Sequence, residues 1–247
     1  MAIKKHDFIE IEYTGRLKDN NLLFDTTDQE LAKKEDMFQE NMEYGPVIIC
    51  IGENQVLDGI DSKLVGKNPG DYKFEFPAEQ AFGKKDAKLI QLLPTSKFTK
   101  QGIRAMPGLQ VDIDGTMGVI RTVTGGRTLV DFNHPLSGKE VFYEIKVNRI
   151  VTDIQEQADA YLNVTLRIKD KKIEIKDDIA TIITNIELPD ELTEMLKEKM
   201  KEIFKFSEIN FSVEKEDDKA LKTEVNKEKD KEINNEAIKA DNMPEQD

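Results

Sequence analysis

The hydrophobic pattern changes character within residues 47–66. Residues 47–51 form an uninterrupted apolar run rich in β-branched side chains, which is typical of a buried strand. Gly52 ends this run, and the apolar residues that follow recur with the spacing of one helix face: Val56, Leu57, Ile60 and Leu64. Gly66 is a suitable stop, because glycine adopts the left-handed backbone at a helix end without steric cost. The sequence therefore predicts a short helix over residues 55–66 that packs its apolar face onto a sheet.

Regular alternation predicts the strands of that sheet. Residues 8–17, 72–76 and 143–147 alternate apolar with polar side chains, the pattern of half-buried strands. A longer charged segment, residues 28–45, predicts a short helix or an ordered loop. The side chains that we assign to the core outright are Ile49, Phe74 and Phe76.

The middle of the chain has shorter strand candidates, over residues 89–94, 109–113 and 117–123. Gly125 and Gly126 predict a tight hairpin turn, because glycine supplies the positive φ that such turns require. Residues 84–132 are therefore expected to form a small all-β domain inserted between the two parts of the first domain.

After residue 152 the composition shifts towards Ile and Lys, and the pattern indicates a small α+β domain over residues 153–213. Residues 161–168 and 172–175 are expected to pair as a hairpin. A helix is expected to begin near Pro189, since proline is tolerated in a first turn. Its apolar stripe comprises Leu192, Met195, Leu196, Met200, Ile203 and Phe204, and a strand over residues 209–213 follows. Residues 214–247 are charged and contain no aromatic residue, which predicts a disordered tail.

Charge and cysteine content exclude several classes of function. A net charge of −13 argues against nucleic acid or an anionic membrane as the partner. The N-terminal residues lack the apolar stretch of a secretory signal, and no run reaches the roughly 20 apolar residues of a spanning helix. We therefore expect a cytoplasmic protein. The single cysteine, Cys50, excludes an intramolecular disulfide and is expected to be a core thiol.

The usual catalytic groups are missing from the sequence. His6 and His134 are the two histidines, and because they are isolated from each other the sequence predicts no His-based metal site. The sequence also has no Gly-rich phosphate loop and no Ser nucleophile elbow. An enzyme built from these residues would have to work without a nucleophile, a metal or a cofactor. Rotation about an Xaa-Pro peptide bond meets that condition, because it breaks no covalent bond.

Spaced motifs carry a resemblance to a known family. They read, in chain order, Tyr13-Thr14-Gly15-Arg16-Leu17, Leu23-Phe24-Asp25-Thr26-Thr27, Gly52-Glu53-Asn54-Gln55-Val56-Leu57-Asp58-Gly59-Ile60 and Ala81-Phe82-Gly83. This order resembles the framework of FKBP-type prolyl isomerases. Asn133-His134-Pro135-Leu136-Ser137-Gly138-Lys139, after an inserted β unit, is similar to the SlyD branch, whose insert-in-flap domain is a chaperone domain. The further C-terminal domain resembles that of the long archaeal FKBPs.

The resemblance implies an α+β fold in which a half-wrapped antiparallel sheet surrounds a short helix. The isomerase domain would comprise residues 1–83 and 133–152, and the insert residues 84–132. The side chains that would line the prolyl pocket are Tyr13, Phe24, Asp25, Val56, Leu57, Ile60, Phe82 and Tyr143. In the family, the backbone N–H at the Leu57 position holds a substrate carbonyl. For each of these residues the alternative is plain core packing.

Two positions depart from the family pattern. Ile60 stands where many members have a tryptophan, and Phe82 replaces a tyrosine whose hydroxyl can bond to the substrate. The lost hydroxyl is expected to weaken ligand binding by about 1 kcal/mol.

The inserted domain is the candidate for binding unfolded chains that contain Xaa-Pro bonds. Its large apolar residues exceed what a fifty-residue module easily hides, and those chosen as contacts are Leu89, Ile90, Leu92, Leu93, Met106, Met117 and Ile120. The alternative is that they are the core of the insert. Two functions stay open: an isomerase with built-in chaperone activity, and a holdase or assembly factor on an idle isomerase scaffold. The C-terminal domain is a candidate for self-association or partner docking.

Overall fold

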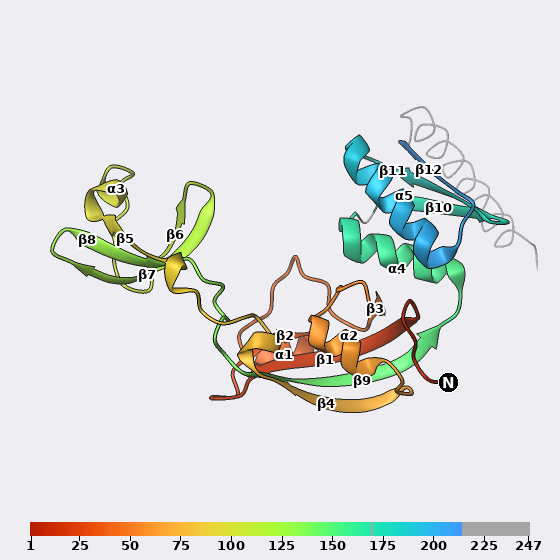
Figure 1. Ribbon diagram of the computed structural model, residues 1–247, viewed down its shortest axis with the longest axis horizontal. Coiled ribbons are helices and arrows are strands. Elements are labelled where there is room, and N and C mark those ends of the chain that lie inside the picture. The colour runs from red at the N-terminus through yellow and green to blue at the C-terminus, as the bar shows by residue number, and fades with distance from the viewer. Residues whose placement is uncertain (169, 214–247) are drawn as a thin grey trace, which may run out of the picture. The chain divides into compact units, whose positions relative to one another are not determined.

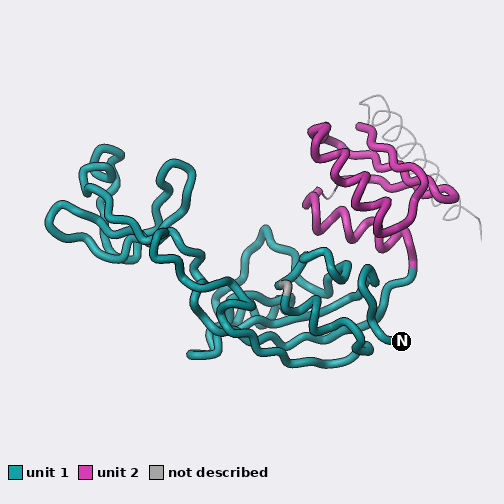
Figure 2. Tube along the Cα trace, viewed as in Figure 1, with its two compact units in different colours: residues 1–152 teal, residues 153–247 magenta. Residues whose placement is uncertain are grey.

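The computed structural model describes residues 1–168 and 170–213, and the tail predicted for residues 214–247 lies outside the described residues (Figure 1). The chain divides into two compact units, Met1–Thr152 and a second that begins at Asp153 (Figure 2). In the part of the chain that the structure describes, no helix combines the length and the apolar character needed to cross a membrane.

The first unit is built on a five-stranded antiparallel sheet. Its strands are β1 (Phe8–Leu17), β2 (Leu23–Thr26), β3 (Val47–Cys50), β4 (Gly70–Phe76) and β9 (Val141–Val151). The order is β2-β1-β9-β4, and β3 pairs with the first half of β1. Between β2 and β3, the segment expected to be a helix or loop holds α1 (Gln29–Lys34), which begins where the Asp28 carboxylate accepts the Glu30 and Leu31 N–H groups.

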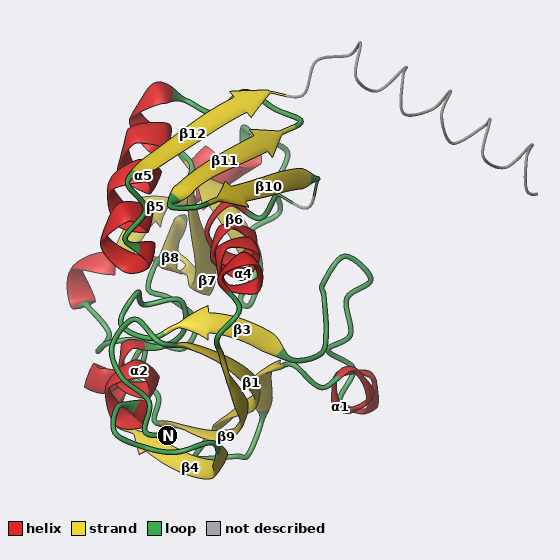
Figure 3. Cartoon of the chain, turned by 90° about the vertical axis from the view of Figure 1, so that its right-hand side faces the viewer, coloured by secondary structure: helices red, strands yellow, loops and turns green. Residues whose placement is uncertain are grey.

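Helix α2 (Asp58–Leu64) packs against the curved sheet (Figure 3). It is shorter than the helix predicted over residues 55–66. The preceding residues form a loop, because the Gln55 side-chain oxygen accepts the Cys50 N–H at 2.7 Å and Asp61 accepts the Gly52 N–H at 2.7 Å. Gly66 has φ +83°, which confirms the glycine stop. The core assignment is confirmed for Ile49, Phe74 and Phe76, which are buried with Ile60 and Leu64.

The inserted domain interrupts the first unit between β4 and β9. The 3₁₀ turn η1 (Ala78–Gln80) precedes it, and a second 3₁₀ turn, η2 (Ala87–Leu89), lies at its start. Its four antiparallel strands, in the order β5-β8-β7-β6, are β5 (Ile90–Pro94), β8 (Arg127–Asp131), β7 (Thr116–Thr124) and β6 (Gln110–Ile113). The domain is built on a β-sheet as predicted, and it also contains one short helix that the sequence did not predict, α3 (Thr95–Thr99), in which Phe98 is completely buried. The domain has its own core of Phe98, Val111, Ile113, Ile120 and Val130.

The second unit contains α4 (Ile154–Leu166), β10 (Lys171–Lys176), β11 (Ile179–Thr184), α5 (Asp190–Phe204) and β12 (Glu208–Val213). Its sheet has the order β10-β11-β12. The helix that begins at Asp190 and the last strand were predicted. Met200 and Leu196 of the predicted stripe are buried, whereas Met195 is 53% exposed.

The hairpin predicted between residues 161–168 and 172–175 was wrong, because the first of these segments belongs to α4. The Asp153 carboxylate accepts the Glu156 N–H at 2.7 Å and starts the helix. Ala158, Tyr161 and Leu162 then repeat with helical spacing and are buried. Strand β10 pairs with β11 instead.

Candidate active site

A small cavity of about 100 Å³ opens where β1, β2 and β9 meet the loop before α2. Its lining residues are Tyr13, Asp25, Gln55, Val56, Leu57, Ile60 and Tyr143. Six of these seven were predicted as pocket residues from the sequence. Gln55 was not, although it stands inside the motif that carried the prediction. The helix-spacing pattern had assigned it only to the start of a helix.

The loop before α2 is fixed from both of its ends. Gln55 is bonded to β3 through Cys50, and the Leu57 carbonyl accepts the Ile60 N–H at 2.7 Å. Leu57 itself has an extended backbone, with φ −58° and ψ +126°. The loop therefore presents Val56 and Leu57 at the cavity, while Ile60, 1% exposed, forms its floor.

Aromatic rings form one wall of the cavity. Phe24 meets Tyr143 edge-on at 5.7 Å between ring centroids, and it meets Phe82 in the same way, also at 5.7 Å. Tyr13 and Tyr143 lie 6.0 Å apart. Such edge-to-face pairs hold rings in defined orientations. Phe24 and Phe82, the two remaining predicted residues, thus lie beside the cavity: Phe24 contacts Tyr143 of its lining, and Phe82 contacts Phe24.

The close packing of this wall depends on Gly15 of β1. A Cβ at this position would lie 2.8 Å from Cε1 of Tyr143 and 2.9 Å from Cζ of Phe24. Glycine therefore lets both rings approach the strand.

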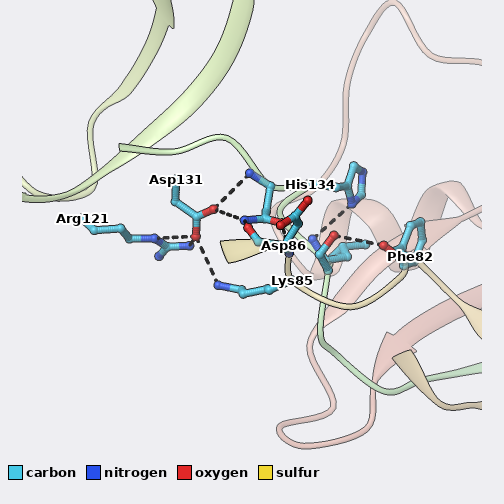
Figure 4. A network of polar contacts seen from close by, with 9 residues as sticks. Phe82, Lys85, Asp86, Arg121, Asp131 and His134 are labelled. Atoms are coloured by element: carbon cyan, nitrogen blue, oxygen red, sulfur yellow. Dashed lines mark hydrogen bonds and ion pairs between the residues drawn. The ribbon is translucent and has the colours of Figure 1, made fainter. Parts of the chain in front are cut away.

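His134, which follows the insert in the sequence, extends the aromatic wall. Its ring stacks on that of Phe82, with centroids 5.0 Å apart and planes 10° apart. Its Nδ1 atom accepts the Leu136 N–H at 3.2 Å, which orients the ring (Figure 4). Sequence reasoning treated His134 only as an isolated histidine. Its place in the Asn133–Lys139 motif was the available signal.

The polar edge of the cavity is a pair of side chains, Tyr13 and Asp25. Burial raises the pKa of the Tyr13 phenol, and the Asp25 carboxylate adds to that shift as a nearby charge and hydrogen-bond partner. Burial also raises the pKa of the Asp25 carboxyl, against hydrogen bonds from Tyr13 and from the Thr26 backbone. Burial, followed by the charge of Asp25, raises the pKa of Tyr143. Both phenols are therefore neutral across the physiological range.

Comparisons with known proteins identify the family of this chain. A family model described as FKBP-type peptidyl-prolyl cis-trans isomerase matches residues 1–99. The chain is 30% identical over 149 residues to the short-type peptidyl-prolyl cis-trans isomerase of Methanocaldococcus jannaschii, an alignment that covers 60% of this chain and 94% of that relative. The chain belongs to the FKBP-type peptidyl-prolyl cis-trans isomerase family.

Further relatives support the SlyD-like organisation of this FKBP-type isomerase. A model described as FKBP26, IF domain matches residues 91–136, within the insert and the linker after it. The chain is 27% identical over 154 residues to the SlyD isomerase of Haemophilus influenzae, which covers 60% of this chain and 72% of that protein. It is 32% identical over 110 residues to the FKBP-type 16 kDa isomerase of Escherichia coli K12, which covers 42% and 74%.

The insert of this isomerase exposes part of its predicted contact set. Leu89, Leu92, Met106 and Met117 are between 41% and 59% exposed, and Ile90 and Leu93 are half-buried. Ile120 is the exception, because it is fully buried in the core of the insert. It cannot contact a bound chain without unfolding that core, so the expectation for this residue was wrong.

A larger depression of about 410 Å³ spans β1, β4 and β9 of the isomerase domain, and charged residues are prominent in its lining. Glu144 pairs there with Lys73, and Glu12 lies 3.9 Å from Lys146. The smaller cavity remains the candidate active site, because it brings Asp25, Leu57 and Ile60 of the spaced motifs together with the two tyrosines.

Proposed function

We propose that prolyl isomerisation takes place in the cavity between Tyr13, Leu57, Ile60 and Tyr143. Rotation about an Xaa-Pro bond has a barrier of about 20 kcal/mol, because the twisted amide loses its resonance. The twisted form is less polar than the planar amide, so an apolar, water-poor pocket binds it better. Every 1.36 kcal/mol of such preferential binding gives about a tenfold rate increase. The observation that carries the proposal is the convergence of six motif residues on this one cavity.

The residues divide into an apolar group and a polar group. Ile60 and Val56 accommodate the proline ring, and the aromatic wall excludes water from the amide. The Leu57 N–H donates to a backbone carbonyl of the substrate. This hydrogen bond holds the peptide in place while the Xaa-Pro bond rotates. The Tyr13 phenol donates to Asp25, and these two side chains together form the polar edge of the pocket.

We further propose that the insert binds unfolded polypeptides. Its support is the exposure of Leu92, Met106 and Met117 on a domain that already has a separate core. Exposed large apolar side chains mark surfaces that bind other apolar groups. Tethering a chain there raises the local concentration of its prolyl segments at the neighbouring cavity. The partners would be unfolded cytoplasmic chains that contain Xaa-Pro bonds.

The first test is the cis-to-trans isomerisation of a short Xaa-Pro peptide by the full chain. Acceleration that falls in both Asp25→Ala and Phe82→Ala would support catalysis in this cavity. The absence of acceleration, together with suppressed aggregation of an unfolded protein, would favour the alternative of a holdase on an idle isomerase scaffold.

A matched pair of variants tests the insert. Met117→Ser changes an exposed side chain of the insert, 59% exposed, and Met195→Ser changes one of the second unit, 53% exposed. We expect the first to slow catalysis on an unfolded protein and the second to leave it unchanged. Deletion of residues 84–132 should likewise slow that reaction far more than the peptide reaction, and equal losses on both substrates would contradict the proposal.

A further inference from the structure

Two linkers, residues 83–89 and residues 132–138, join the sheet of the insert to the isomerase domain. Hydrogen bonds cross between them along their length. Nearest the cavity, the Gly138 N–H donates to the Gly83 carbonyl at 2.8 Å. Nearest the insert, the Phe132 N–H donates to the Leu89 carbonyl at 2.9 Å. The linkers therefore form a ladder rather than two independent tethers.

Asn133 forms the middle of this ladder. Its side-chain oxygen accepts the Asp86 N–H at 2.7 Å, and its Nδ2 atom donates to the Asp86 carbonyl at 3.0 Å. One side chain thus pairs with both backbone groups of a residue on the opposite linker, as a neighbouring strand would.

Asp131, at the end of β8, holds together the parts that meet at the ladder (Figure 4). Its Oδ2 atom accepts from Arg121 of β7 at 2.8 and 3.1 Å, and from Lys85 of the first linker at 3.3 Å. Its Oδ1 atom accepts from the backbone and the side chain of Asn133, at 3.0 and 2.8 Å. The residue is 2% exposed, so its charge is balanced almost entirely by these groups.

The electrostatics make this arrangement persistent. Burial raises the pKa of the Asp131 carboxyl, but the hydrogen bonds from Asn133, Arg121 and Lys85 together hold it well below its ordinary value. The carboxylate is therefore charged throughout the physiological range. The contacts are costly to break, because the buried carboxylate would then be left without compensating partners.

The same segment continues from the insert to the wall of the active site. Ser137, 5% exposed, donates from Oγ to the Phe82 carbonyl at 3.0 Å, and the His134 ring stacks on Phe82. Residues 131–138 therefore contact the insert at one end and the pocket wall at the other.

We propose that Asp131 is a positioning residue that clamps the two linkers and so holds the insert at a fixed place relative to the prolyl cavity. It acts through Arg121, Lys85 and Asn133 and touches no substrate. The benefit of this clamp to catalysis rests on the proposed function. A polypeptide bound to a fixed insert presents its prolyl segments to the cavity more often than one bound to a loose insert.

The clamp itself can be tested without any substrate. Backbone ¹⁵N relaxation of the full chain reports the tumbling of β7 and β8 separately from that of β1 and β9. We expect one common rotational correlation time in the wild type, and a shorter one for the insert in Asp131→Asn. Asp114→Asn is the matched control, because the Asp114 carboxylate pairs with Lys97 at the surface of the insert. Unchanged tumbling in Asp131→Asn, or an insert that already tumbles freely in the wild type, would overturn the proposal.

Lys85→Gln covers the case in which Asp131→Asn unfolds the insert. It removes the contact between Asp131 and the first linker but keeps the Arg121–Asp131 pair inside the insert. With either variant folded, kcat/KM should fall about tenfold on an unfolded protein and stay within about twofold on a short peptide. Equal kcat/KM on the protein substrate, despite a loosened insert, would reject the positioning role. If the insert loosens and the wild-type insert gives no advantage on protein substrates, the clamp stands and the proposed chaperone function fails.

Discussion

The ring of His134 lies flat against that of Phe82, 5.0 Å away, although 52 positions separate them and the whole insert stands between them in the sequence. The contact joins the two ends of the interruption at the wall of the active site. Phe82 in turn meets Phe24, and Phe24 meets Tyr143 of the cavity. The stack thus links the linker after the insert to the prolyl pocket.

We expect His134→Ala to lower kcat/KM on a short Xaa-Pro peptide by about two- to tenfold. Loss of the stacked ring removes roughly 0.5–1.5 kcal/mol of aromatic contact from Phe82 and lets it turn away from Phe24. His134→Phe keeps a flat ring at this place and should retain most of the activity. Equal loss in both variants would show that the stack is not the reason.

We expect Phe82→Tyr to bind a prolyl peptide about fivefold more tightly than the wild type. The added hydroxyl restores a hydrogen bond with a net value of about 1 kcal/mol, which corresponds to that factor. Calorimetry of peptide binding checks this. Phe98→Tyr, which adds the same hydroxyl in the core of the insert, is the control and should not bind the peptide more tightly. Unchanged affinity would mean that the hydroxyl does not reach the peptide.

We expect Gly15→Ala to displace the rings of Phe24 and Tyr143, because its Cβ would lie 2.8 Å from Tyr143 and 2.9 Å from Phe24. Overpacking of this kind costs about 1–3 kcal/mol of stability. The peptide reaction should slow as well, since both rings belong to the active-site wall.

Gly118→Ala is the matched control for that variant. Its Cβ would clash equally, 2.7 Å from Val130 and Phe132, but within the insert. It should cost similar stability and leave the peptide reaction near the wild-type rate. Slowing of the peptide reaction in both variants would point to a general loss of stability.

The raised pKa of Asp25 predicts a pH dependence of stability with a defined sign. Between the unfolded-state pKa and the higher native pKa, the native protein binds more protons than the unfolded chain. The free energy of unfolding therefore falls as the pH rises through this window. In Asp25→Asn this contribution is absent, so the variant should gain stability relative to the wild type as the pH rises from the ordinary Asp pKa of about 3.9 through the raised native pKa. Parallel denaturation midpoints across that range would contradict the buried position of this carboxyl.

Most of the isomerase domain and its site could be predicted from the sequence. Alternation along residues 8–17 and 143–147 places Tyr13 and Tyr143 on the same face of the sheet, and helical spacing places Ile60 on the face of α2 that packs against it. These are local periodicities, and a local pattern suffices when each strand and helix has one apolar face to bury. Leu57 reaches the cavity from the loop before α2, which helical spacing did not predict. The resemblance of the motifs then supplied the order of the elements.

The sequence misled where local preference and tertiary packing disagree. The β-branched and aromatic residues of 161–168 favour a strand, but Ala158, Tyr161 and Leu162 gain burial only as one face of α4. Phe98 gave no periodic signal because α3 is a single turn.

Only the tertiary structure decided which apolar residues of the insert are exposed to solvent and how the insert is attached to the isomerase domain. Ile120 and Met117 are three positions apart on β7, so they face opposite sides of the sheet. Ile120 is fully buried in the core that contains Phe98 of α3, whereas Met117 is 59% exposed, and the sequence did not show which face would be covered. Asp131, Arg121, Lys85 and Asn133 meet through contacts of up to 46 positions. Periodicity determines which side chains share a face, whereas the partner that covers a face, and the charges that meet across it, depend on how distant segments pack.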